Sequence, residues 1–194
     1  MESLRLEPFS RPFERTFAPP GSKSLTNRAL VLAALCEAPC KLTGALFADD
    51  TRVMLDSLAK LGFETEIDEA AKTITVKGRG GIIPNAKADL FCGNSGTTIR
   101  FVTALATLGR GEFTVDGIPR MRQRPIGPLA TMLRNLGGRI EHTMADGYPP
   151  LHITADELPG GIVQYGSETS SQYLSAVLQV APYAHRRSGR RPHR

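Results

Sequence analysis

Residues 21–35 read GSKSLTNRALVLAAL, a short polar loop that runs directly into an apolar helix. The same order of loop and helix returns in residues 94–108 (NSGTTIRFVTALATL) and in residues 167–181 (SETSSQYLSAVLQVA). Within these stretches Ser24, Thr97 and Ser170 are each 73 residues apart. A period of this length is too long for a solenoid, and it predicts the duplication of a supersecondary unit.

The segments that follow each helix also repeat. Residues 51–61 and 127–136 have the amphipathic spacing of helices that end at a glycine. Alternating strands are expected in two pairs, at 63–67 with 73–77 and at 139–144 with 151–154. Each unit is therefore expected to run strand, helix, strand, helix, strand, strand. The third unit breaks off after its first helix, which predicts an α+β fold of βαβαββ units that is truncated in the third.

The charge of the chain is distributed unevenly. The hydrophobic fraction of 41% and the charged fraction of 22% are those of an ordinary globular protein. Residues 185–194 hold five arginines and no acid, so they carry the whole net charge of +5. We expect a folded body over residues 21–184 and a non-native or disordered arginine-rich tail over residues 185–194. A polyanion-binding or RNA-binding protein that acts through this tail is the alternative from another functional class.

Cysteine usage and hydropathy exclude several kinds of protein. The three cysteines lack metal-ligand spacing and suit a reducing cytoplasm, where they would be small buried hydrophobes. The longest apolar run, residues 29–36, is too short to cross a bilayer. The N-terminus has no apolar core of a secretory signal. We therefore expect a cytoplasmic chain without a metal site, a membrane contact or a specific nucleic-acid partner.

The first loop has side chains that suit an anionic ligand. It leads into a helix N-terminus, where free N–H groups and the helix dipole favour phosphate or carboxylate. Lys23 adds a mobile cation and Ser24 a hydrogen-bond donor, and Arg28 falls four residues after Ser24 on the same helical face. An N-cap serine with two solvated cations is the simpler alternative.

The second unit offers two further groups. The loop around Asn94, Gly96 and Thr97 allows a ligand to approach the backbone closely, although a simple turn and helix cap would use the same residues. Arg100, on the first turn of the following helix, could face the same anion or solvent. A later run of arginines is typical of a solvated face, but Pro125 fixes Arg124 at a stiff junction between loop and helix.

The third loop supplies two hydroxyls and an amide, from Ser170, Ser171 and Gln172, and ordinary capping is again the alternative. Three anion-friendly loops from one repeated unit form a stronger signal than any one of them. Together they predict a substrate with at least two anionic groups.

These loops resemble the signature segments of one family. Residues 20–30 (PGSKSLTNRAL) are similar to the N-terminal signature of EPSP synthases, and residues 93–100 (GNSGTTIR) are similar to the second. The segments 124–126 and 170–172 resemble later substrate-binding segments, and order and spacing agree from about residue 17 to residue 183. The UDP-N-acetylglucosamine enolpyruvyl transferases share the architecture but lack the Ser-Lys-Ser and Asn-Arg phrase.

The resemblance implies a fold of two lobes, each of three βαβαββ units about a pseudo-threefold axis. This chain would supply most of the first lobe (residues 21–184), and residues 1–20 would pack with the second. The implied reaction moves the enolpyruvyl group of phosphoenolpyruvate to the 5-hydroxyl of shikimate 3-phosphate and releases phosphate, without a metal or an organic cofactor. The product serves aromatic amino-acid biosynthesis, and family members are usually monomeric.

The resemblance also implies roles for individual residues. Shikimate 3-phosphate would be held by Lys23, Ser24, Arg28, Ser170, Ser171 and Gln172. Phosphoenolpyruvate would be held by Lys23, Asn94, Gly96 and Arg124, with Thr97 and Arg100 as further candidates.

Two departures from the family affect what we expect of the chain. The acidic, lysine and arginine residues of the second lobe have no counterpart here, and acid–base catalysis needs such groups against the reacting atoms. The chain alone is therefore expected to be inactive, unless it is one lobe of a split enzyme. In addition, Phe101 follows Arg100 where many members have proline, which alters the expected pocket for phosphoenolpyruvate.

Overall fold

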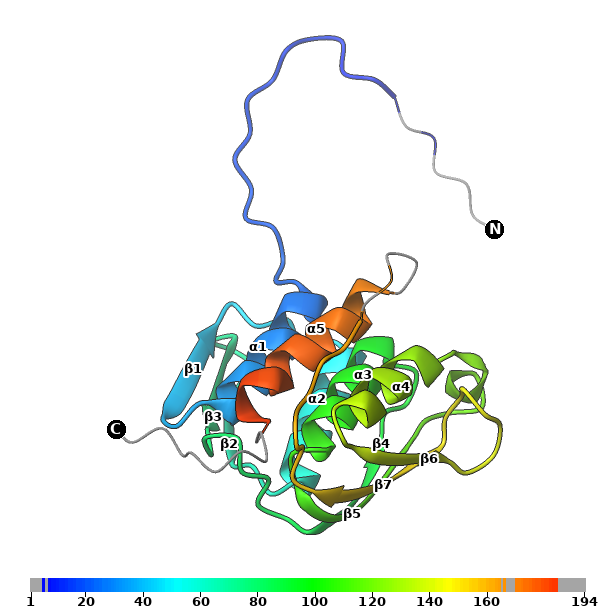
Figure 1. Cartoon of the computed structure of the whole chain (residues 1–194). Coiled ribbons are helices and arrows are strands. Elements are labelled where there is room, and N and C mark those ends of the chain that lie inside the picture. The colour runs from blue at the N-terminus through cyan, green and yellow to red at the C-terminus, as the bar shows by residue number, and fades with distance from the viewer. Residues whose placement is uncertain (1–4, 6, 165, 167–169, 185–194) are drawn as a thin grey trace.

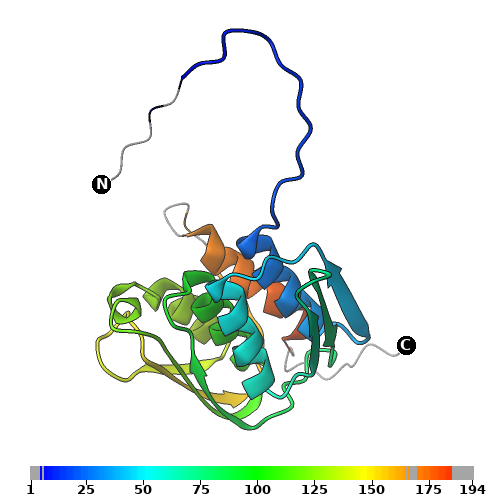
Figure 2. The same cartoon turned by 180° about the vertical axis from the view of Figure 1, so that it is seen from behind.

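The computed structural model describes residues 5, 7–164, 166 and 170–184. Its elements follow in the order α1 (Lys23–Leu35), β1 (Pro39–Thr43), α2 (Asp49–Lys60), β2 (Thr65–Asp68), β3 (Thr73–Lys77), β4 (Lys87–Phe91), α3 (Gly96–Ala106), β5 (Arg110–Asp116), η1 (Met121–Gln123), α4 (Gly127–Asn135), β6 (Arg139–His142), β7 (Leu151–Asp156), α5 (Ser171–Val180) and η2 (Ala181–Tyr183). The helices lie together, with one sheet at each side of them (Figures 1 and 2). This arrangement confirms the α+β class.

The two sheets share a pattern of antiparallel strand pairing. In the first sheet, with the order β1-β3-β2, β3 pairs antiparallel with both neighbours. In the second, with the order β4-β5-β7-β6, β7 takes the place of β3, and β4 adds a parallel strand beside β5. The corresponding strands confirm that a supersecondary unit is duplicated.

The expected order of six elements is complete only in the second unit, β4-α3-β5-α4-β6-β7. Among the described residues that precede α1 there is no strand, and the same holds for those between β7 and α5. The prediction that every unit begins with a strand is therefore wrong for the described part of the first and third units. As a result, β1 is an edge strand, whereas its counterpart β5 is paired on both sides.

Serine caps begin the three equivalent helices. The side chains of Ser22, Ser95 and Ser170 accept hydrogen bonds from backbone N–H groups in the first turns of α1, α3 and α5. The cap of α1 is thus Ser22 and not Ser24, and Ser170 corresponds to Ser22 and Ser95. The 73-residue spacing therefore holds between the first two units, whereas the caps of the second and third units lie 75 residues apart.

Glycines end α2 and α4 in the expected way. Gly62 (φ +92) and Gly137 (φ +90) adopt the left-handed conformation directly after each helix. In both cases the next backbone N–H turns back to the helix, from Phe63 to Leu58 at 3.0 Å and from Gly138 to Leu133 at 2.9 Å. This hydrogen bond holds Phe63 at the helix end, so β2 begins two residues later than predicted, at Thr65.

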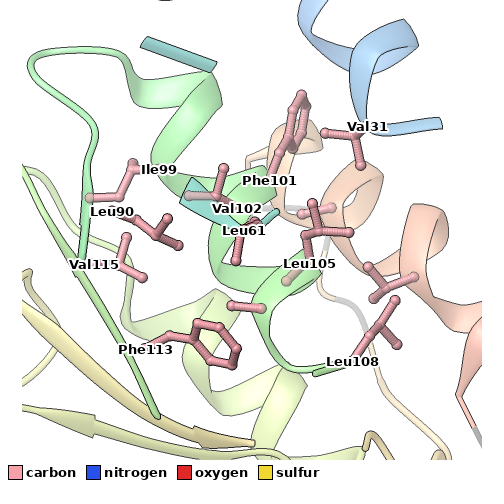
Figure 3. Packing of buried hydrophobic residues seen from close by; sticks show 14 of the residues in the cluster. Val31, Leu61, Leu90, Ile99, Phe101, Val102, Leu105, Leu108, Phe113 and Val115 are labelled. Atoms are coloured by element: carbon pink, nitrogen blue, oxygen red, sulfur yellow. The ribbon is translucent and has the colours of Figure 1, made fainter. Parts of the chain in front are cut away.

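Helix α3 forms the centre of the core. Every residue of α3 except Arg100 is buried. Figure 3 shows Ile99 facing Leu90 and Val115 of the second sheet, while Phe101 lies beside Val31 of α1. Phe101, which was expected to alter the pocket beside Arg100, is fully buried, so its side chain points into the core. Burial of such a side chain contributes about 1.5–3 kcal/mol to stability.

The Asn27 amide joins the first unit to the second inside this core. Asn27 is 0% exposed, and its Nδ2 lies 3.1 Å from Thr97 Oγ1 and 3.2 Å from Thr98 Oγ1. The same Nδ2 donates to the carbonyl oxygen of Asp50 at 3.3 Å. One side chain of α1 therefore ties down the first turns of α2 and α3.

The ends of the chain can be described only in part. Residues 5 and 7–20 extend away from the body without helix or strand (Figure 1). The arginine-rich tail, residues 185–194, lies outside the described residues, as do Ser167, Glu168 and Thr169 of the third loop. None of the helices in the described part has both the length and the apolarity of a membrane span. Those residues also contain no group of three or more His, Cys, Asp or Glu side chains that could hold a metal ion.

We predict that Asn27→Ala lowers the free energy of unfolding by about 1–2 kcal/mol, because it removes the two buried N–H groups that link α1 to three acceptors on α2 and α3. Urea unfolding followed by circular dichroism measures this change. Asn85→Ala serves as the control, since it removes one exposed hydrogen bond, from Asn85 Nδ2 to the Lys60 carbonyl at 2.9 Å. Equal losses in the two variants would contradict a special role for Asn27.

Candidate functional site

A hollow of about 600 Å³ opens where helices of all three units begin. The side-by-side helices α1 and α5 begin at the same end of the molecule (Figures 1 and 2). The hollow is lined by Lys23, Ser24, Asp49, Asp50, Val53, Gly93, Asn94, Ser95, Gly96, Thr97, Arg124 and Gln172. Helix N-termini present free N–H groups and a positive dipole end, so this convergence favours an anionic ligand.

Lys23 is the mobile cation of the hollow. Its side chain is 58% exposed, and Nζ lies 3.6 Å from Asp50 Oδ2. An ion pair this exposed contributes little to stability, so Lys23 can leave Asp50 for a stronger anion at small cost. The Thr97 hydroxyl donates to Asp50 Oδ2 at 3.5 Å. The oxygen of this hydroxyl also accepts a hydrogen bond from Asn27 Nδ2. The Thr97 hydroxyl is thus engaged within the protein.

Arg28 supports the first loop through Ser24 and does not line the hollow. Its Nη1 donates to the side-chain oxygen of Ser24 and, at 3.2 Å, to the Ser24 carbonyl. Its Nη2 lies 3.4 Å from Ser175 Oγ on α5, and the guanidinium lies 5.2 Å from the centre of the Phe101 ring. The predicted pairing of Ser24 and Arg28 on one helical face is confirmed, and it places Arg28 between the first and third units.

Arg124 lies across the second loop. Its Nη1 donates to the Asn94 carbonyl at 3.1 Å. The guanidinium lies so close to Gly96 that a Cβ atom at this position would come within 2.5 Å of Arg124 Nη2. Glycine at position 96 therefore provides the space that the arginine occupies. The hydrogen bond to Asn94 uses one N–H group of the fork and leaves others for an anion.

The neighbouring arginines have other partners. Arg122 Nε donates to Asp116 Oδ1 at 3.0 Å, and this hydrogen bond raises the pKa of Arg122. Arg120 is exposed and donates to Gln123 Oε1 at 3.1 Å. Of this run, only Arg124 reaches the hollow, and the solvated-face interpretation holds for the other two.

The third unit enters the hollow through Gln172. The guanidinium of Arg100 donates to Gln172 Oε1 and lies 4.9 Å from the ring centre of Tyr173. Arg100 therefore contacts the third helix instead of lining the hollow. Ser170 caps α5 and Ser171 is its first residue; both are exposed beside Gln172, and neither lines the hollow.

Two acidic residues line the hollow that the sequence did not predict for the site. Asp49 and Asp50 occupy the first turn of α2, where carboxylates interact favourably with the helix dipole. Their place directly before the amphipathic stretch was the available signal, but it indicates a helix start and gives no hint of an anion-binding loop opposite. These acids compensate the cations of the hollow.

The cysteines differ in burial. Cys92, directly before the second loop, is 0% exposed, and burial raises the pKa of its thiol strongly. Its thiol is therefore protonated at neutral pH and acts as a packing group. The expectation of buried cysteines is wrong for Cys36, at the end of α1, and for Cys40, in β1, which are both half-buried.

Comparisons with known proteins agree with this geometry. The sequence model described as EPSP synthase (3-phosphoshikimate 1-carboxyvinyltransferase) matches residues 10–188. This chain belongs to the EPSP synthase family.

Individual relatives show how much of the family's length the chain covers. The 3-phosphoshikimate 1-carboxyvinyltransferase of Shewanella amazonensis is 47% identical over 185 residues, which are 95% of this chain and 43% of that protein. The enzyme of Trichormus variabilis is 42% identical over 184 residues, with the same coverage. The solved EPSP synthase from Acinetobacter baumannii superposes with a TM-score of 0.78 at 27% identity, over 87% of this chain and 38% of that one. The chain thus spans less than half the length of these relatives.

We predict that Gly96→Ala displaces the Arg124 guanidinium and changes the free energy of unfolding by less than about 1 kcal/mol. The added methyl meets the far end of a flexible side chain, which can move away. A crystal structure and a thermal unfolding curve of the variant measure the two effects. Gly96→Ala combined with Arg124→Ala is the control, since the clash is then absent. An unmoved guanidinium in the single variant would contradict the prediction.

Proposed function

We propose that this chain is the substrate-binding first lobe of a 3-phosphoshikimate 1-carboxyvinyltransferase. The reaction transfers the enolpyruvyl group of phosphoenolpyruvate to the 5-hydroxyl of shikimate 3-phosphate and releases inorganic phosphate. The observation that carries this proposal is the convergence of Lys23, Arg124 and the N-termini of four helices, α1, α2, α3 and α5, on one hollow. Membership of the family supports the identity of the substrates.

The contacts assign complementary tasks to the two cations. Arg124 lies across Gly96 with one N–H group bound to the Asn94 carbonyl, and its planar fork suits the bidentate grip of a carboxylate or phosphate. Lys23 is more exposed and only loosely paired, so it can turn from Asp50 to an anion that enters beside it. In this proposal Arg124 and Asn94 hold phosphoenolpyruvate, and Lys23 bridges the two substrates.

Shikimate 3-phosphate is assigned to the face formed by α1 and α5. Ser24 and Gln172 line the hollow from these two helices, and each is held by an arginine behind it, Arg28 and Arg100 respectively. Ser170 and Ser171 are exposed at the adjacent end of α5, from which their hydroxyls can reach a phosphate bound at the helix N-terminus. The arginines orient these groups before the ligand arrives, which reduces the entropy cost of binding.

The hollow offers little for proton transfer. Asp50 is already paired with Lys23 and accepts a hydrogen bond from Thr97, and Asp49 is the exposed first residue of α2. Addition to phosphoenolpyruvate and elimination of phosphate need a positioned acid and a positioned base. We propose that the second lobe of the family supplies these groups and that the present chain binds without catalysing.

The 194-residue chain is expected to release no phosphate from a mixture of both substrates, yet to bind shikimate 3-phosphate weakly. A colorimetric phosphate assay and isothermal titration calorimetry measure the two properties. Addition of a separately expressed second lobe from the Shewanella amazonensis relative provides the complementation control. Phosphate release by the chain alone would overturn the proposed division of labour, and restored activity in the mixture would favour a split enzyme.

Lys23→Met is expected to weaken shikimate 3-phosphate binding by about 10- to 100-fold, as the loss of a charge-assisted hydrogen bond predicts. Lys41→Met removes an equal charge from the exposed face of β1 and serves as the matched control. Calorimetric titration of the three proteins at one ionic strength gives the comparison. Equal affinities for the Lys23 and Lys41 variants would remove Lys23 from the site.

A further inference from the structure

We propose that Tyr173 is a positioning residue for Arg124, through a hydrogen bond from its hydroxyl to the backbone next to that arginine. The inference rests on the proposed function, in which Arg124 binds an anion. Tyr173 is only 4% exposed. Its hydroxyl, however, donates to the Pro125 carbonyl at 2.6 Å.

The segment around Arg124 has few backbone anchors of its own. The Arg124 N–H closes the short helix η1 by a hydrogen bond to the Met121 carbonyl at 2.9 Å. Pro125 has no N–H to donate, so the segment lacks one possible anchor at this residue. On the far side, the N–H groups of Ile126 and Gly127 both bind the Gly147 carbonyl, at 2.8 and 2.9 Å.

The Tyr173 bond is therefore the side-chain anchor between these two backbone anchors. It fixes the carbonyl of Pro125, which shares a peptide plane with the Ile126 N–H, so both polar groups of the peptide that follows Pro125 are hydrogen-bonded. Because the guanidinium must fit over Gly96 and reach the Asn94 carbonyl at 3.1 Å, a small rotation of this backbone moves the fork out of place. A misplacement of about 1 Å is enough to impair a positioned binding group.

Arg100 contacts both Tyr173 and the residue before it. The Arg100 guanidinium lies 4.9 Å from the centre of its ring and donates to Gln172, the preceding residue. Gln172 lines the hollow, whereas Tyr173 reaches beneath the loop of Arg124. Two adjacent residues of α5 thus face different parts of one site. Any shift of α5 relative to the second unit is passed to both, which couples the third unit to the anion-binding arginine.

The decisive variant is Tyr173→Phe, which removes one oxygen and keeps the ring, its packing and its contact with Arg100. Tyr183→Phe is the matched control, because it removes a hydroxyl from a half-buried tyrosine in η2, directly after α5. In the free protein, arginine Nε–Hε signals in NMR spectra report on the guanidinium groups, and Arg124→Lys identifies the signal of Arg124. We expect this signal to shift or broaden in Tyr173→Phe and to stay in place in Tyr183→Phe.

Ligand binding supplies a second measurement. Tyr173→Phe is expected to weaken phosphoenolpyruvate binding by about fivefold, the equivalent of one ordinary hydrogen bond. In an Arg124→Gln background the same change is expected to have no further effect, since Tyr173 acts through the arginine. A general loss of stability would instead weaken binding equally in both backgrounds, and thermal unfolding of each variant monitors such a loss.

The outcomes separate this inference from the proposed function. An unchanged Arg124 signal in Tyr173→Phe, or an equal loss of affinity in both backgrounds, overturns the positioning role. If the Arg124 signal moves but Arg124→Gln leaves phosphoenolpyruvate binding unchanged, the positioning role stands and the assignment of Arg124 to this substrate fails.

Discussion

The arrangement of the hollow depends on the buried amide of Asn27. This single group holds the first turns of α2 and α3 against α1, with donor distances of 3.1 to 3.3 Å. Asp50 and Thr97 lie on those first turns and Lys23 begins α1, so the position of the amide fixes how these three helix starts meet. An apolar side chain could fill the same space, but it could not link these hydroxyl and carbonyl groups of α2 and α3 to α1 by hydrogen bonds.

A second constraint is that functional side chains are supported by residues outside the hollow. Arg28 holds Ser24, Arg100 holds Gln172, and Tyr173 holds the backbone beside Arg124. Arg100 and Tyr173 lie on a different element from the group that they support, whereas Arg28 lies one turn after Ser24 on the same helix. The site is therefore a property of how three units pack together, and each loop by itself is an ordinary capped helix start.

This dependence on packing explains which parts of the structure could be predicted from the sequence. The caps, the glycine stops of α2 and α4 and the hydrophobic alternation of β3 are local signals, and they placed most elements within two residues. Asp50 contacts Lys23, 27 positions away in the chain, and Tyr173 contacts Pro125, 48 positions away. No spacing rule reaches across such distances. The lack of a strand among the described residues before α1 could not be foreseen either, since the repeat itself predicts one.

The edge strand β1 has a consequence for the behaviour of the protein in solution. Its counterpart β5 is paired on both sides, whereas β1 has β3 on one side only in the described structure. An edge of this kind offers a row of backbone donors and acceptors to strands of other molecules, which is a route to aggregation. Lys41 stands exposed at the middle of β1, and Pro39 at its start lacks an N–H group. A charge and a proline at these positions discourage strand pairing between molecules, so two residues far from the hollow help to keep the protein dispersed.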